Sequence, residues 1–125
     1  PLCLVGSEMC IRDSINGREP FIEGIETIVT RGHTPGLLHP VVSDGSNKLF
    51  YGADIFPMVA HIPIPWVMAY DVQPVVTMEE KQKLLQKMER EDWILFFEHD
   101  PHIQACTVHK DGKHYKLNKE IKISD

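Results

Sequence analysis

The sequence predicts an α/β domain, and three observations support that prediction. Several short segments alternate β-branched and polar residues and end at Gly, Pro, Asn or Asp, as strands do. One segment combines a capping pattern with an apolar stripe at helical spacing. A continuous apolar run near residue 95 has the length of a buried strand. With 125 residues, 42% hydrophobic and 25% charged, the chain has the size and composition of one globular domain.

The first fourteen residues, PLCLVGSEMCIRDS, show no clear helical or strand period. They resemble the peptide that results when a sequencing adapter is translated. We therefore predict that residues 1–14 are a non-native leader and that residues 15–125 are a fragment of a longer protein. The alternative is an unusual but genuine N-terminal segment. Under the first interpretation Cys3 and Cys10 are accidental, and Cys106 is the remaining cysteine.

Three strands are expected before residue 54. Residues 25–30 (IETIVT) alternate and are rich in β-branched side chains, and they end in a loop of Gly and Pro at 31–36. Residues 38–43 and 48–53 flank Asp44-Gly45-Ser46-Asn47, whose Asp-Gly pair indicates a hairpin turn. These signals predict a strand, a loop and then a hairpin.

A proline-rich segment follows at 55–76. Its four prolines, at positions 57, 63, 65 and 74, exclude a long regular helix. Irregular loops of this length are uncommon in compact domains unless they have a function. We expect a functional or covering loop with short helical turns.

One helix is expected next, from Thr77 to about Glu91. Thr77 and Glu80 form a capping-box pattern at its start, and its apolar stripe is Leu84, Leu85 and Met88. The run at 93–97 (WILFF) then suits a strand buried on both faces. A terminal hairpin is expected from 104–109 and 113–117 about Asp111-Gly112.

Composition excludes several classes of protein. The net charge of −5, with acidic and basic residues interspersed, argues against nucleic acid or an anionic membrane as partner. No apolar run approaches the roughly 20 residues that a membrane helix needs. Three scattered cysteines do not suggest a disulfide framework, so a reducing cytoplasm is the expected location.

Three polar residues each follow a predicted strand: His33, Asp54 and His99. Ligands of sheet-based folds gather outside the carboxyl ends of strands. Two imidazoles and a carboxylate suit zinc or a similar divalent ion, and a carboxylate can bridge two cations. Gly52 is expected to let the backbone approach whatever Asp54 binds. On spacing alone the alternative stays open that these histidines are surface or hydrogen-bonding residues.

The motifs around these residues resemble those of metallo-β-lactamase-fold proteins. Gly32-His33-Thr34-Pro35-Gly36 looks like the third metal motif of that family, Gly52-Ala53-Asp54 like the fourth and Glu98-His99-Asp100 like the fifth. The order matches, and the resemblance covers residues 25 to about 117. It implies the four-layer αββα fold, of which this chain would form about the C-terminal half.

Within that fold, GAD-x-F-P, the AHIPIPW loop, the Tyr70-Asp71 pair and ILFFEHDP look most like lactonase-type members, including quorum-quenching N-acyl-homoserine lactonases. The resemblance implies a metal-dependent hydrolase with a small-molecule substrate. Two divalent ions, with zinc expected, would generate hydroxide that attacks a lactone or ester carbonyl. His33 would bind one ion, His99 the other and Asp54 both. Asp54 would also handle the proton released on ring opening.

The sequence departs from the family pattern in three places. No His-x-His-x-Asp-His cluster, which forms the family's first motifs, occurs anywhere in the chain. Leu37 replaces the second histidine of GHTPGH, and Pro57 stands where some lactonases have a catalytic tyrosine. We therefore expect this chain alone to have negligible hydrolase activity and weak metal affinity, because two ligands per ion are fewer than zinc sites use.

Other polar and aromatic residues have more ordinary interpretations. His39 is expected to be structural, and His102, His109 and His114 are expected to be exposed. His61 and Trp66 are candidate substrate-binding residues, with core or lid packing favoured for Trp66. Asp71 is a candidate turn cap.

Two rival functions remain: a redox member of the fold, such as a persulfide dioxygenase or di-iron protein, and a non-catalytic fragment. Half of the fold would also leave one sheet face open, including much of 93–97, and such a patch tends to aggregate or pair.

Overall fold

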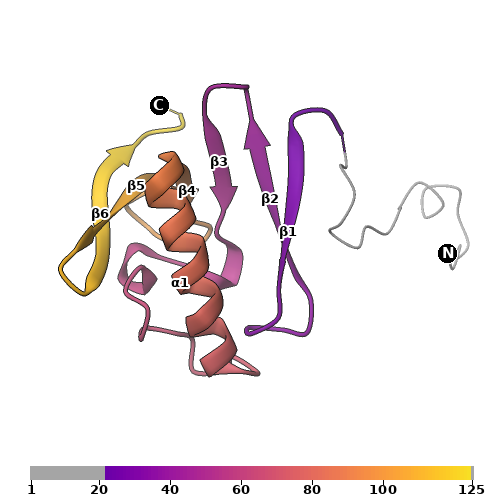
Figure 1. Cartoon of the computed structure of the whole chain (residues 1–125), viewed down its shortest axis with the longest axis vertical. Coiled ribbons are helices and arrows are strands. Elements are labelled where there is room, and N and C mark those ends of the chain that lie inside the picture. The colour runs from indigo at the N-terminus through magenta and orange to yellow at the C-terminus, as the bar shows by residue number, and fades with distance from the viewer. Residues whose placement is uncertain (1–21, 125) are drawn as a thin grey trace, which may run out of the picture.

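The computed structural model describes residues 22–124, which form one mixed six-stranded sheet in the order β1-β2-β3-β4-β5-β6 (Figure 1). Neighbouring strands are antiparallel except β3 and β4, which run parallel. The leader predicted at 1–14 lies outside the described residues. The strands are β1 (Ile25–Thr30), β2 (Leu37–Ser43), β3 (Lys48–Tyr51), β4 (Ile94–Phe96), β5 (Ala105–Asp111) and β6 (His114–Ile121).

One helix, α1 (Pro74–Glu91), covers one face of the sheet and lies in the connection from β3 to β4 (Figure 1). Parallel neighbours need such a crossover because a short turn cannot return the chain to the same end of the sheet. The predicted stripe Leu84, Leu85 and Met88 is buried, and it belongs to the same core cluster as Trp93 and Leu95. The connection also contains two 3-10 turns, η2 (Ala53–Ile55) and η3 (Val59–His61), as expected for the proline-rich segment.

The predicted capping box at the helix start is wrong. The helix begins at Pro74, with Gln73 as N-cap, because proline already has a helical φ and lacks only an N–H that would be unpaired there. Thr77 lies one turn inside the helix, where its hydroxyl donates to the Gln73 carbonyl at 3.3 Å. Glu80 bonds instead to the loop after β1.

The strand predictions hold with shifted ends. Residues 25–30 form β1 as predicted, and β2 begins one residue early at Leu37. The third strand ends at Tyr51 rather than at residue 53, because the chain turns into η2. The apolar run gives a strand of only 94–96, whereas the terminal hairpin is longer than predicted and extends over 105–111 and 114–121.

The sheet face opposite α1 is open, as expected. It has an apolar hollow of about 380 Å³, lined by Pro40, Val42, Leu49, Tyr51, Phe96 and Ile123. The expectation that most of 93–97 would lie on this face is wrong. Trp93, Leu95 and Phe97 are at most 3% exposed, because strand alternation points them toward the α1 side, while Phe96 faces the hollow.

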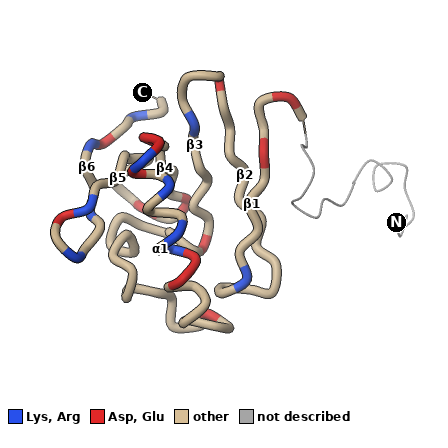
Figure 2. Tube along the Cα trace, in the orientation of Figure 1, with Lys and Arg blue, Asp and Glu red and all other residues tan. Residues whose placement is uncertain are grey.

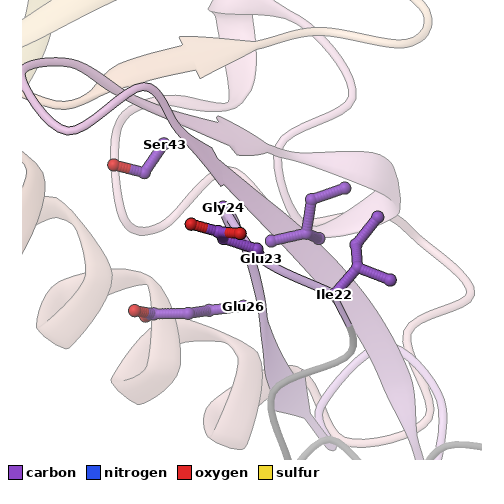
Figure 3. A pocket seen from close by; sticks show the side chains of 6 residues that line it. Ile22, Glu23, Gly24, Glu26 and Ser43 are labelled. Atoms are coloured by element: carbon purple, nitrogen blue, oxygen red, sulfur yellow. The ribbon is translucent and has the colours of Figure 1, made fainter.

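A second, smaller hollow lies at the beginning of β1, at the opposite end of that strand from His33. Figure 3 shows its lining, which includes Glu23, Glu26 and Ser43, and its volume is about 190 Å³. The Ser43 N–H donates to the Gly24 carbonyl at 2.8 Å, so this backbone is already paired. The hollow is part of the sheet edge and lies apart from the three candidate ligands.

Charges are dispersed over the molecule. Figure 2 shows basic and acidic residues interspersed along α1 and the terminal hairpin, as the sequence indicates. Within residues 22–124 no helix has both the length and the apolar character needed to cross a bilayer.

His39 is a structural residue, which confirms the prediction made for it. Its ring is fully buried and stacks on Phe50 at 5.0 Å between centroids. Nδ1 donates to the Tyr51 carbonyl at 3.0 Å, and Nε2 then accepts from the Thr30 hydroxyl at 2.8 Å. The ring therefore ties together β1, β2 and β3 near the ends from which two candidate ligands project.

We expect this histidine to make the fold acid-sensitive. Burial lowers the pKa of His39 from 6.5 to about 4, against the opposing effect of its bond to Tyr51. In the unfolded chain His39 becomes protonated below about pH 6.5, whereas in the folded chain it stays neutral down to about pH 4. The free energy of unfolding therefore decreases as pH falls from 6.5 toward 4. The loss approaches about 3 kcal/mol, since one pKa unit corresponds to about 1.4 kcal/mol.

Urea unfolding of the wild type and His39→Gln across pH 4–7 tests this expectation. The variant should be less stable at pH 7, but its stability should depend less on pH. Parallel curves for the two proteins would contradict the assignment, because other titrating groups contribute equally to both.

Candidate functional site

The loop that presents His33 is fixed to the N-terminal part of α1. The carboxylate of Glu80 accepts from the Arg31 N–H at 2.7 Å and the Gly32 N–H at 3.0 Å. In return, the Gln73 N–H donates to the Gly32 carbonyl at 2.8 Å, and the Val72 N–H donates to that of His33 at 3.2 Å. Four backbone groups of the loop are thus paired, two with Glu80 of α1 and two with the segment entering α1, which leaves the His33 ring little freedom.

Gly32 is required by this close approach. A Cβ built on Gly32 would lie 2.3 Å from both the amide nitrogen and the hydroxyl oxygen of Thr77. Such distances are far below van der Waals contact, and the helix backbone cannot yield. The loop can therefore lie against α1 only with glycine at this position.

The His33 ring lies between two carboxylates. Its Nδ1 lies 2.7 Å from Asp71 Oδ1, and its Nε2 lies 3.4 Å from Asp54 Oδ2. The His33 side chain is 9% exposed and that of Asp71 only 1%. Tyr70 adds an edge contact with the ring at 6.3 Å between centroids. Both ring nitrogens therefore have a defined direction.

Asp54 lies in η2, directly after β3. The preceding Ala53 has φ +43°, a left-handed conformation that costs free energy in a residue with a Cβ. Gly52 also has a role, but not the expected one, because its close neighbours are the protein's own backbone. A Cβ there would lie 2.9 Å from the Phe56 carbonyl oxygen and 3.0 Å from that of Phe96. This tight turn projects Asp54 from the end of β3.

His99 approaches Asp54 from the other side. Its Nε2 lies 3.1 Å from Asp54 Oδ1, and Glu98 Oε2 lies 3.8 Å from the same nitrogen. The His99 N–H donates to the Pro57 carbonyl at 3.1 Å, and Asp100 accepts from the Val59 N–H at 3.0 Å. The loop after β4 is therefore attached to the start of the proline-rich segment.

The two oxygens of Asp54 thus each face one histidine nitrogen, Oδ2 toward His33 and Oδ1 toward His99. This donor set suits borderline divalent ions, because imidazole nitrogen and carboxylate oxygen are the usual zinc ligands. Asp54, Glu98 and His99 also place one donor atom each within 4.8 Å of one another. The side chains of Asp54 and His99 are 35% and 52% exposed, so ions and small molecules can reach them.

The proline-rich segment is held by a buried lysine that the sequence prediction missed. Lys81 is fully buried, and its Nζ donates to the carbonyls of Pro63 at 2.9 Å, Ile64 at 3.3 Å and Trp66 at 2.7 Å. Burial lowers its pKa to about 8, and the nearby negative charge of Asp71 acts in the opposite direction. Lys81 thereby attaches this segment to α1.

The two candidate substrate residues lie on this segment. His61 is half-buried, and burial and the charge of Lys81 lower its pKa. Trp66 is 65% exposed, so the expected core packing is wrong for it within the described part of the chain. Among residues 22–124 neither side chain hydrogen-bonds to His33, Asp54 or His99. Of the other histidines, His102 and His114 are exposed as predicted, whereas His109 is only half-exposed.

The fold matches solved structures, whereas no family description and no curated protein matches the sequence. One match is a probable metal-dependent hydrolase from Staphylococcus aureus, with a TM-score of 0.70, 26% identity, and 83% of this chain covered. Another is AidC, a dizinc quorum-quenching lactonase, with a TM-score of 0.74, 19% identity and 88% of this chain covered. This chain has part of the metallo-β-lactamase fold.

A third match is AbOPH, a hydrolase of the β-lactamase superfamily, with a TM-score of 0.71, 22% identity and 87% of this chain covered. The predicted fold class is confirmed. The chain spans 39% of the Staphylococcus aureus hydrolase and 38% of each of the other two structures. It therefore corresponds to less than half of the length of these proteins.

Proposed function

We propose that this chain provides part of a dinuclear metal site in a hydrolase of lactones or esters, with His33, Asp54 and His99 as ligands. The observation that supports this most directly is the arrangement around Asp54, whose two oxygens each face a histidine nitrogen. A carboxylate in that position can bind one ion through each oxygen. His33 would hold one ion and His99 the other, and zinc is the ion we expect at both positions.

When bound, divalent ions lower the pKa of water and polarise a carbonyl oxygen. The residues of this chain have two tasks around that chemistry. His33 and His99 hold their nitrogens in fixed directions through the contacts of their loops. Asp54 would accept the proton of the attacking water and pass it to the alkoxide oxygen released when the lactone C–O bond breaks.

Asp54→Asn should abolish metal binding by this chain. We expect the wild type to bind Co²⁺ or Zn²⁺ weakly, because two protein ligands per ion are fewer than the usual three or four. The amide of asparagine is a poor ligand and cannot bridge two cations. Calorimetric titration with each metal measures the loss, with Asp44→Asn as control because Asp44 lies in the exposed β2–β3 turn. Equal affinity in wild type and Asp54→Asn would contradict the ligand assignment.

Catalysis requires a separate test. The 125-residue chain should show negligible turnover of N-hexanoyl-homoserine lactone, because it lacks the His-x-His-x-Asp-His cluster. The product of an upstream-extended reading frame that contains such a cluster should hydrolyse the lactone and lose activity in His33→Ala. Turnover by the 125-residue chain that His33→Ala abolishes would overturn the claim of an incomplete site. Iron-dependent oxygen consumption by the extended protein would favour the redox alternative instead.

A further inference from the structure

A buried carboxylate lies behind the His33 ring, on the side away from Asp54. The Asp71 side chain is 1% exposed, and among residues 22–124 its carboxylate forms one hydrogen bond, the 2.7 Å contact between Oδ1 and His33 Nδ1. Burying a carboxylate costs free energy unless it is hydrogen-bonded or paired with a positive charge. The ammonium group of Lys81 is a nearby positive charge. The negative charge of Asp71 acts to raise the pKa of Lys81.

Capping a turn, the role considered from the sequence, is not what the Asp71 side chain does. Its carboxylate accepts from the imidazole and from no backbone N–H among residues 22–124, while its own N–H donates to the Met68 carbonyl at 3.1 Å. The next two residues, Val72 and Gln73, pair with the carbonyls of His33 and Gly32. The segment 71–73 therefore holds both the ring and the backbone of the His33 loop.

We propose that Asp71 is a positioning residue that fixes His33 as its Nδ1–H tautomer and directs the Nε2 lone pair toward Asp54. An ionised carboxylate can only accept hydrogen bonds, so the proton must be on Nδ1. In a neutral imidazole, Nε2 is then free to act as a ligand, and it lies 3.4 Å from Asp54 Oδ2. A carboxylate behind a ligating histidine also raises the basicity of the ligating nitrogen. Only the statement that Nε2 binds a metal rests on the proposed function.

The tautomer can be measured on the metal-free chain by two-bond ¹H–¹⁵N correlation spectra, with the His33 signals assigned by their loss in His33→Gln. In the wild type we expect a protonated Nδ1 whose proton resonates strongly downfield. Asp71→Asn preserves shape, but an amide can donate as well as accept, so the Nδ1–H population should fall. Asp92→Asn makes the same change of charge at the C-cap of α1, far from His33, and should leave the spectrum unchanged.

A second readout is affinity for Co²⁺, which should fall about 10- to 100-fold in Asp71→Asn and not in Asp92→Asn. An unprotonated Nδ1 on His33 in the wild type would overturn the proposal, and so would an unchanged Nδ1–H population in folded Asp71→Asn. If Asp71→Asn does not fold, the wild-type spectrum decides, because a downfield Nδ1 proton itself reports the bond to a carboxylate. If the tautomer is as expected and the extended protein hydrolyses no lactone, the proposed function fails and the role of Asp71 stands.

Discussion

Gly32→Ala is expected to destabilise the chain by roughly 3 kcal/mol, at the upper end of typical overpacking effects. The added Cβ would lie 2.3 Å from the amide nitrogen of Thr77, within the first turns of α1. The helix backbone cannot move that far without losing its own hydrogen bonds, so the loop must move instead. The bonds from Glu80 and Gln73 to the loop are then stretched or broken.

The same displacement should weaken metal binding, because His33 follows Gly32 directly. Urea unfolding and Co²⁺ titration measure the two effects. Gly36→Ala is the matched control in the same loop, since a Cβ there meets no atom within 4 Å. Its stability should stay within about 0.5 kcal/mol of the wild type. If Gly32→Ala were as stable as Gly36→Ala, the loop would not be as tightly placed against α1 as described.

Lys81→Met should have a comparable effect, about 3 kcal/mol of lost stability, by a different mechanism. Methionine fills a similar volume but donates nothing to the carbonyls of Pro63, Ile64 and Trp66. Leaving these part-buried carbonyls unpaired costs more than is recovered by no longer burying a charge. Limited proteolysis should then cut the segment around residues 62–70 faster than in wild type. Lys83→Met on the exposed side of α1 is the control.

The pH dependence of this effect has a defined sign. The folded chain releases the Lys81 proton near pH 8 and the unfolded chain near 10.5, so the unfolded state binds more protons between these values. The Lys81 contribution to wild-type stability therefore rises as pH increases from 8 to 10.5. Lys81→Met lacks this contribution, so the stability difference between the two proteins isolates it. If the stability difference between wild type and Lys81→Met did not change between pH 8 and 10.5, this would contradict the lowered pKa of Lys81.

The three candidate ligands were identifiable from the sequence for a physical reason. Each lies where a strand signal stops, at a Gly- or Pro-containing turn, and strand ends of one sheet edge are close in space. The residues that orient them gave no comparable local signal. Asp71 is 38 positions from His33, and Glu80 is 48 positions from Gly32, so only the assembled fold brings them together.

One misinterpretation and one omission in the sequence analysis have local causes. The Thr77-Met78-Glu79-Glu80 pattern fits a capping box, but Pro74 three residues earlier was the stronger start signal. Lys81 precedes Leu84 and Leu85 by three and four residues, which is the helical spacing of one face. Helical spacing therefore indicated that Lys81 lies on the buried face of α1. Its charge argued against that placement, because lysine is almost never fully buried unless its ammonium group is paired.

The parallel pairing of β3 and β4 has a consequence for how the site assembles during folding. The chain closes the whole α1 crossover before Leu49 can pair with Ile94 and Tyr51 with Phe96. Closing a long loop costs entropy that the local hairpins β1–β2 and β5–β6 do not incur to the same degree. Asp54 and His99, 45 positions apart, are therefore expected to meet after those hairpins form. A contact that forms late stabilises the native state mainly by slowing unfolding, so a bound ion should lengthen the lifetime of the folded chain more than it speeds folding.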